Sequence, residues 1–234
     1  MTAWSLISGT VDEAIGRTHR ADPVRDRTGG PAGNARLTAW VGAVLFVLFA
    51  IEGVTLLDVR GLITWHFAVG LLLVPPALAK TATTGWRIVR YYRGDRGYRD
   101  AGPPPLLLRL LGPLVVVATL AVLGTGVALV LIGPAASRRP LPGGLDAVML
   151  HKATFLVWFA ATAPHVLARL LPAVRLMTRP VRAVPGRAWR ATVLAVTAVA
   201  AGASAALVIG AAGQWHDAPG ERHERPPARH VTHW

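Results

Sequence analysis

The stretch LTAWVGAVLFVLFAIEGVTLL at residues 37–57 has a single ionisable residue, Glu52, among 21 positions. A run of about 20 mainly apolar residues is long enough to cross the hydrocarbon core of a bilayer as an α-helix. Only Asp58 to Gly61 separate it from a second such run, LITWHFAVGLLLVPPALAKTA at residues 62–82. Two apolar runs with so short a connection predict a transmembrane helical hairpin.

Three more apolar runs follow, at about residues 110–132, 148–171 and 191–212. Gly102-Pro103-Pro104-Pro105 stops any helix ahead of the third run. Charged residues make up 16% of the chain, against about 25% in an ordinary soluble protein. We therefore predict an all-α fold, a polytopic transmembrane helical bundle of about five spans, between polar tails at 1–36 and 213–234.

Arginine placement predicts the orientation of the bundle. Five arginines lie in residues 1–36, six in 83–109 and six in 169–190, whereas the opposite connections and tail have one, two and three. Lysine and arginine are enriched on the cytoplasmic side of membrane proteins. The bias predicts a multi-pass protein of a bacterial plasma membrane, with the N-terminus cytoplasmic and the C-terminus external.

The composition also excludes several functions. The net charge of +13 does not indicate nucleic-acid binding, because the arginines sit at helix ends rather than on one soluble face. With no cysteine, disulfides, thiolate metal sites and covalent haem attachment are excluded. The sequence has no nucleotide-binding loop, no Ser/His/Asp set and no paired carboxylates, so no soluble substrate is evident. We also expect no secretory signal peptide.

Both tails carry weaker signals. Apolar residues in the first tail allow a short amphipathic helix on the membrane, but its Gly, Pro, Asp and Arg content favours a mostly disordered segment. The last tail contains four histidines, which allow transition-metal binding. Their loose, proline-rich spacing favours a solvated tail. The apolar residues of the first tail are Trp4, Leu6, Ile7, Val11 and Ile15, and the histidines of the last are His216, His223, His230 and His233.

Two histidines are predicted at one depth in the membrane. His66 lies about four residues into the second span and His151 about three residues into the fourth. Both spans run in the same direction, so each imidazole is roughly 5 Å below the outer boundary. Ionisable residues inside spans often mark function, and histidines on facing helices hold haem iron in helical bundles. The residues alone leave two readings open: axial ligands of one haem, or two separate histidines that each bond a neighbouring group.

Nearby residues suit the haem reading. Gly70 lies one turn after His66 and leaves a flat patch beside it, while Phe155 and Trp158 follow His151 on its own face. Glu52 is placed to hydrogen-bond an axial histidine and raise its basicity. Glycines in the third span allow close approach of a ring, and basic residues at the outer surface could pair with propionates. These are Gly124 and Gly126, and Arg60, Arg138, Arg139 and Lys152.

His165 follows His151 by 14 residues, about 21 Å along the helix and on the same face. Two ligands so spaced on one helix suit two stacked haems. The matching position in the second span is Lys80 rather than histidine, so the inner site lacks an evident second ligand. The alternative for His165 is a polar residue of the inner interface, behind a kink at Pro164.

The fragments ITWHFAVGLLLVPPALAK (63–80) and LHKATFLVWFAATAPHVLARL (150–170) resemble the bacterial cytochrome b561-type superfamily. That group includes the cytochrome b subunits of formate dehydrogenases and nickel–iron hydrogenases. The chain is also similar to small actinobacterial membrane proteins described as cytochrome b/b6-like. The resemblance covers about residues 37–171 and departs from the dehydrogenase subunits in lacking a histidine on the first span.

The resemblance implies a haem b-binding electron-transfer subunit that works between a quinone pool and a partner redox protein. It is at most a subunit of an oxidoreductase. His66 and His151 would be the axial ligands of an outer haem, and His165 would match the ligand of an inner one. The alternatives are a membrane anchor or assembly factor without cofactor, and a small transporter. A transporter needs a polar path across the midplane, which the uncharged third span does not offer.

Overall fold

The computed structural model describes residues 3–15, 17, 22–178 and 184–216. Five helices in it are long and apolar enough to cross a membrane, and the described residues contain no strand. The prediction of an all-α bundle with five spans is therefore confirmed. The helices are α2 (Gly30–Thr55), α3 (Ile63–Tyr92), α5 (Leu106–Ser137), α6 (Ala147–Thr178) and α7 (Arg187–Ala206).

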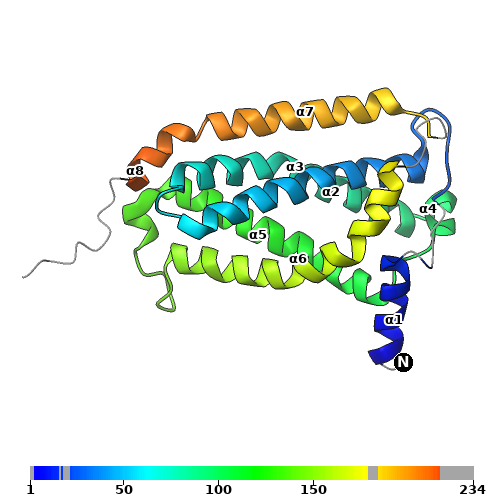
Figure 1. The fold of residues 1–234 in the computed structure, drawn as a ribbon, viewed down its shortest axis with the longest axis horizontal. Coiled ribbons are helices and arrows are strands. Elements are labelled where there is room, and N and C mark those ends of the chain that lie inside the picture. The colour runs from blue at the N-terminus through cyan, green and yellow to red at the C-terminus, as the bar shows by residue number, and fades with distance from the viewer. Residues whose placement is uncertain (1–2, 16, 18–21, 179–183, 217–234) are drawn as a thin grey trace, which may run out of the picture.

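Four of these helices close a bundle. α2 packs on α3, α3 on α5, α5 on α6, and α6 returns to α2. The remaining span, α7, packs mainly along α3 at the edge of the molecule, as Figure 1 shows. In this order α3 and α6 lie across a diagonal of the bundle, so side chains from both can meet in its interior.

Sequence features set the ends of the helices. A short 3₁₀ turn, Leu56–Asp58, completes the tight hairpin between α2 and α3, where the Asp58 carboxylate accepts a hydrogen bond from the Gly61 amide at 3.0 Å. The proline run ends at Pro105, and α5 begins at the next residue. Gly133 interrupts α5 with φ 75°, a left-handed conformation that favours glycine, just before Pro134. α6 bends in its second half (Figure 1), which contains Pro164 and Pro172.

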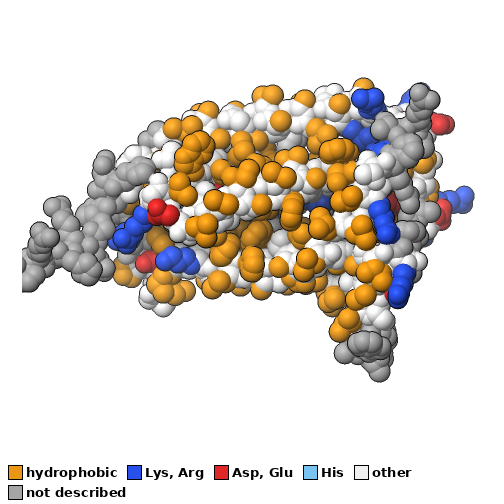
Figure 2. Space-filling model, in the orientation of Figure 1, with side chains coloured by type: hydrophobic (Ala, Val, Ile, Leu, Met, Phe, Trp, Pro, Cys, Tyr) orange, Lys and Arg blue, Asp and Glu red, His pale blue; other side chains and the backbone are white. Residues whose placement is uncertain are grey.

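The apolar surface is that of a protein in lipid. Leu73 and Val41 form the best-buried part of the core between α3 and α2, each 1% exposed. By contrast, Leu131, Val199 and Leu167 are 80%, 74% and 73% exposed on three different helices. Figure 2 shows hydrophobic side chains along the length of the helices, with charged side chains gathered at the two ends. The bundle therefore presents an apolar belt between two polar ends, as a bilayer requires.

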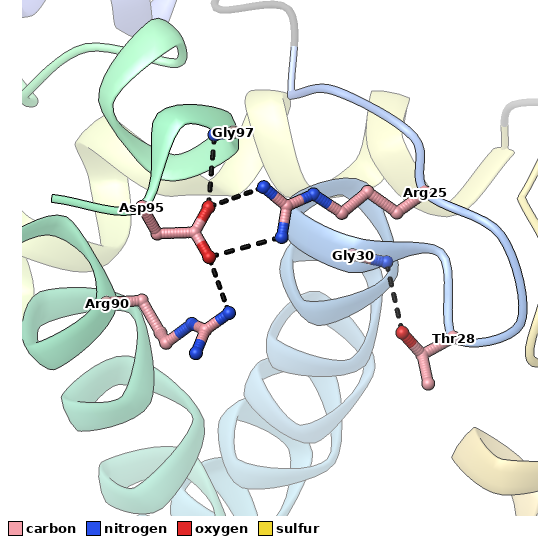
Figure 3. A network of polar contacts seen from close by, with 6 residues as sticks. All are labelled: Arg25, Thr28, Gly30, Arg90, Asp95 and Gly97. Atoms are coloured by element: carbon pink, nitrogen blue, oxygen red, sulfur yellow. Dashed lines mark hydrogen bonds and ion pairs between the residues drawn. The ribbon is translucent and has the colours of Figure 1, made fainter. Parts of the chain in front are cut away.

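A network of ion pairs ties one end together. Asp95, at the start of α4 (Arg96–Asp100), accepts hydrogen bonds from Arg25 at 2.6 and 3.1 Å and from Arg90 at 2.5 Å (Figure 3). It also caps α4 by accepting from the Gly97 amide at 3.0 Å. The Arg25 guanidinium in particular holds the pKa of the Asp95 carboxyl below its usual value of 3.8. This network joins the chain ahead of α2 to the connection after α3.

The first tail differs from the expectation. Residues Ala3–Ala14 form a helix, α1, which packs against α5 and α6. The favoured reading of a mostly disordered tail was wrong over this stretch, because the helix gains contacts with the bundle that local composition does not reveal. Ile7, Val11 and Ile15 remain 47%, 46% and 44% exposed. Of the tail histidines, His223, His230 and His233 lie outside the described residues.

Candidate functional site

His66 and His151 meet inside one end of the bundle. His66 is the fourth residue of α3 and His151 the fifth of α6, and their ring centroids lie 6.4 Å apart with an interplanar angle of 76°. Because α3 and α6 are diagonal partners, the two rings approach each other across the interior. The sequence-based expectation that these histidines share one level is confirmed by this distance.

Glu52 and Thr55 orient the His66 ring. Both lie at the end of α2, and their side-chain oxygens are 2.9 Å from His66 Nδ1. The Thr55 hydroxyl donates to the Glu52 carbonyl at 2.6 Å, so its oxygen and the carboxylate are left as acceptors. Nδ1 therefore carries the proton, and the lone pair of the neutral ring is on Nε2.

Thr125 does the same for His151 from α5. Its hydroxyl lies 3.0 Å from His151 Nδ1 and donates to the carbonyls of Ala121 and Val122 at 2.8 and 3.0 Å. The neighbouring Thr154 hydroxyl, 3.2 Å away, donates to the His151 carbonyl at 2.9 Å. With both hydroxyl protons engaged on carbonyls, Nδ1 of His151 is the donor and Nε2 is again left with its lone pair.

Two glycines make room for these contacts. A Cβ at Gly126 would lie 3.2 Å from His151 Cε1, closer than a side chain ordinarily allows. A Cβ at Gly70 would be 3.5 Å from the Glu52 carboxylate, so Gly70 faces the group that bonds His66. Gly124, which we also expected near a ring, has no atom within 4 Å of such a Cβ.

The aromatic residues lie deeper in the bundle. Phe155 and Phe49 flank Trp158 at centroid distances of 5.9 and 4.5 Å. The indole of Trp158 donates to the Thr119 hydroxyl at 3.0 Å. Together with Ala118 and Val122 they fill the interior one to two turns below the histidines. They therefore form a floor under the pair.

The remaining predicted site residues are spread over both ends. Arg60 and Arg138 are exposed at the end that contains the histidine pair, where the hairpin and α5 terminate. His165 lies towards the other end of α6, and its buried Nδ1 has no hydrogen-bond partner in the part of the chain that the structure describes. The structure thus brings His66, His151 and Gly70 into one neighbourhood and leaves His165 apart from it.

The donor set of the pair fits a haem iron. Two metal–nitrogen bonds of about 2 Å each, with the imidazole radii added, put the ring centroids roughly 6 Å apart, which matches the 6.4 Å observed. Metal-bound histidines typically donate their other ring N–H to a carboxylate or similar oxygen, as both rings do here. Two imidazoles suffice for haem, whereas the described residues contain no group of three or more potential ligands for a bare metal ion.

Sequence reasoning missed the threonines. Thr55, Thr125 and Thr154 are uncharged, and threonine is common in membrane helices as a residue that bonds its own backbone. Depth would have been the usable signal, since Thr55 and Thr125 lie near the same ends of α2 and α5 that face the two histidines.

Comparisons with known proteins add no assignment. No family model matches the chain, and no curated protein or solved structure matches it. The resemblance to cytochrome b proteins therefore stays a prediction that depends on the residues of α3 and α6.

Proposed function

We propose that the chain is a haem b-binding electron-transfer subunit of a bacterial plasma membrane, with its N-terminus cytoplasmic. The observation that carries the proposal is the pair of imidazoles across the bundle diagonal, 6.4 Å apart, each with Nδ1 bound to a side-chain oxygen. An arrangement that fixes both tautomers with Nε2 available is what axial ligation needs. Haem bound there would supply one-electron redox chemistry.

The chain's own residues prepare the site for that role. Glu52 raises the basicity of His66 through its charge-assisted hydrogen bond, which favours an electron-poor, oxidised metal. Thr125 offers only a neutral acceptor to His151. The exposed Arg60 and Arg138 place positive charge at the same end, suited to carboxylates at the membrane surface.

Electron exchange on this proposal takes place near one surface. The pair lies within the first five residues of α3 and α6, roughly 5–6 Å along each helix. A quinone in the adjoining leaflet or a redox protein outside is therefore the proposed partner class. A single centre at this depth does not bridge both leaflets, so the chain is at most one part of a longer electron path.

A visible absorption spectrum of the purified full-length protein tests the proposal, first oxidised and then reduced with dithionite. We expect a sharp reduced α-band that is lost in both His66→Ala and His151→Ala. His165→Ala is the matched control, since it removes another imidazole of a spanning helix, and it should keep the band. A colourless wild-type protein, expressed with adequate haem supply, would refute the proposal.

The second candidate is a membrane anchor or assembly factor without cofactor. The specific observation in its favour is the aromatic floor of Phe49, Phe155 and Trp158, which fills the interior by side chains alone. On that reading the histidines would stabilise the bundle through their hydrogen bonds. A protein without haem whose melting temperature falls in both histidine variants would support it.

A further inference from the structure

The end of the bundle opposite the histidine pair contains a buried lysine. Lys80 of α3 extends its Nζ to α2, where it donates to the Thr38 carbonyl at 2.8 Å. A Cβ at Gly42 would lie 2.8 Å from that Nζ, so the glycine gives the ammonium its place. Among the described residues no carboxylate forms an ion pair with Lys80.

Several polar atoms around Lys80 have no partner. The Thr38 and Thr162 hydroxyls and His165 Nδ1 are all buried without a hydrogen bond in the described part of the molecule. Thr162 precedes His165 by one turn of α6, and the charges of Arg169 and Lys80 both reach the His165 ring. We call this set of Thr38, Lys80, Thr162, His165 and Arg169 the Lys80 cluster.

The cluster differs in chemistry from the histidine pair. Lys80 and His165 follow His66 and His151 by the same 14 residues, but an ammonium bound to a carbonyl is a hydrogen-bond donor and not a metal ligand. A buried charge needs a counter-charge and buried hydroxyls need partners. The ammonium, the two hydroxyls and a ring N–H can all donate at once. Their common missing partner is therefore an anion with several acceptor oxygens.

Depth indicates where such an anion comes from. Lys80 lies 17 residues after the start of α3 and His165 18 residues after the start of α6. These spacings correspond to about 26 and 27 Å, close to the far boundary of a hydrocarbon core of about 30 Å. The phosphates of the leaflet at that end lie just beyond this level. Arg169 is 40% exposed there and connects the cluster to the surface.

The neighbouring α1 also suits a lipid environment. Glu13 of α1 forms an ion pair with Arg169, and α1 keeps Ile7, Val11 and Ile15 exposed. Exposed apolar side chains on a helix at the membrane boundary are typical of an interfacial helix. Since Glu13 compensates Arg169, Lys80 is the charge of the cluster that still needs a partner.

We propose that the Lys80 cluster binds the phosphate group of an anionic membrane lipid. Basic pockets between transmembrane helices are a recognised way to hold lipid head groups. Lys80 supplies the charge, the two threonine hydroxyls and His165 supply further hydrogen bonds, and Arg169 flanks the entry. The proposal does not depend on haem, because none of these residues contacts the histidine pair.

Native mass spectrometry of the full chain, released from detergent after titration with phosphatidylglycerol or with phosphatidylcholine, tests the proposal. We expect retention of the anionic lipid and weaker retention of the zwitterionic one. Lys80→Met should weaken phosphatidylglycerol binding roughly tenfold or more, the effect of losing a charged hydrogen-bond donor. Lys152→Met is the matched control, because it removes the other lysine, which is exposed at the opposite end, and it should bind as wild type.

His165→Phe provides a second variant that leaves the charge of Lys80 in place, and it should weaken binding by a smaller factor. Displacement of the lipid by inorganic phosphate would support the phosphate site and assign it a free ligand as well. Resistance to inorganic phosphate would assign it to lipid alone. Equal phosphatidylglycerol binding by wild type, Lys80→Met and Lys152→Met, with helicity unchanged, would overturn the proposal.

Discussion

Replacement of Gly126 by alanine measures how tightly the His151 ring is held. The new Cβ would lie 3.2 Å from His151 Cε1 and 3.7 Å from Nδ1, so the ring has to move by a few tenths of an ångström. Thr125, on the preceding position, fixes that ring through the 3.0 Å contact to Nδ1. The substitution therefore opposes a steric shift to an existing hydrogen bond.

The magnitude follows from two opposing terms. Alanine in place of glycine inside a helix favours folding by about 0.8–1 kcal/mol, whereas overpacking of a well-fitted interior costs typically 1–3 kcal/mol. Gly124→Ala is the matched control, because the same added methyl meets nothing within 4 Å. It gains the first term alone. Gly126→Ala should therefore be less stable than Gly124→Ala by roughly 1–3 kcal/mol.

Thermal unfolding followed by far-UV circular dichroism in one detergent compares the two variants. For a chain of this size, 1 kcal/mol shifts the melting temperature by about 2–4 °C, so the expected difference is several degrees. Equal melting temperatures, or a more stable Gly126→Ala, would show that the ring is not held against α5. That result would refute the geometry on which axial ligation by His151 depends.

Three further predictions concern single polar contacts. Glu52→Gln should weaken haem binding by roughly tenfold, because a neutral amide replaces a charged second-shell acceptor, and the reduced–oxidised difference spectrum during haem titration measures this; an unchanged affinity would exclude Glu52 from the site. Trp158 loses its hydroxyl partner in Thr119→Val, which should destabilise the bundle by about 1–3 kcal/mol through the unpaired buried indole N–H, as read by the melting temperature. The lowered pKa of Asp95 means that the folded state binds its proton less readily than the unfolded state. The network thus stabilises the fold fully above pH 3.8, the ordinary value, and this contribution is lost as the pH falls through the lowered pKa. A melting series should show that loss in wild type and in the exposed-site control Asp100→Asn but not in Asp95→Asn, and the same acid slope in all three would contradict the assignment.

The number of spans was predictable because the bilayer fixes their length and composition. Apolar runs such as 37–57 and 62–82 need no tertiary information, and α2 and α3 contain them. The ends were harder to predict. α3 continues to Tyr92 and α6 to Thr178, about ten and seven residues past the predicted spans, because arginine-rich segments remain helical where they leave the hydrocarbon core.

The histidine pair was predictable from depth, and its support was only partly so. Equal spacing from two parallel helix starts placed His66 and His151 at one level, and Glu52 was the one carboxylate near them. The orientation of the rings was beyond sequence reasoning, because it depends on which helices are neighbours. Thr125 reaches His151 only because α5 packs against α6, and that arrangement comes from the packing of all four helices.

The two ends of the α3–α6 diagonal are the same geometry with different side chains. At one end two neutral imidazoles have all their N–H groups satisfied and their lone pairs available, which suits a cation. At the other end Lys80 replaces the histidine, a carbonyl takes one ammonium proton, and the remaining polar atoms lack acceptors, which suits an anion. A single substitution within one 14-residue spacing thus changes a site for a metal centre into one for a phosphate. Lys80→His should accordingly weaken lipid binding, and it would create a second imidazole pair with His165. A second haem per chain in that variant, quantified by the pyridine haemochrome, would show that the diagonal itself sets the ligand geometry, whereas unchanged haem content would show that the side chains lining each end decide it.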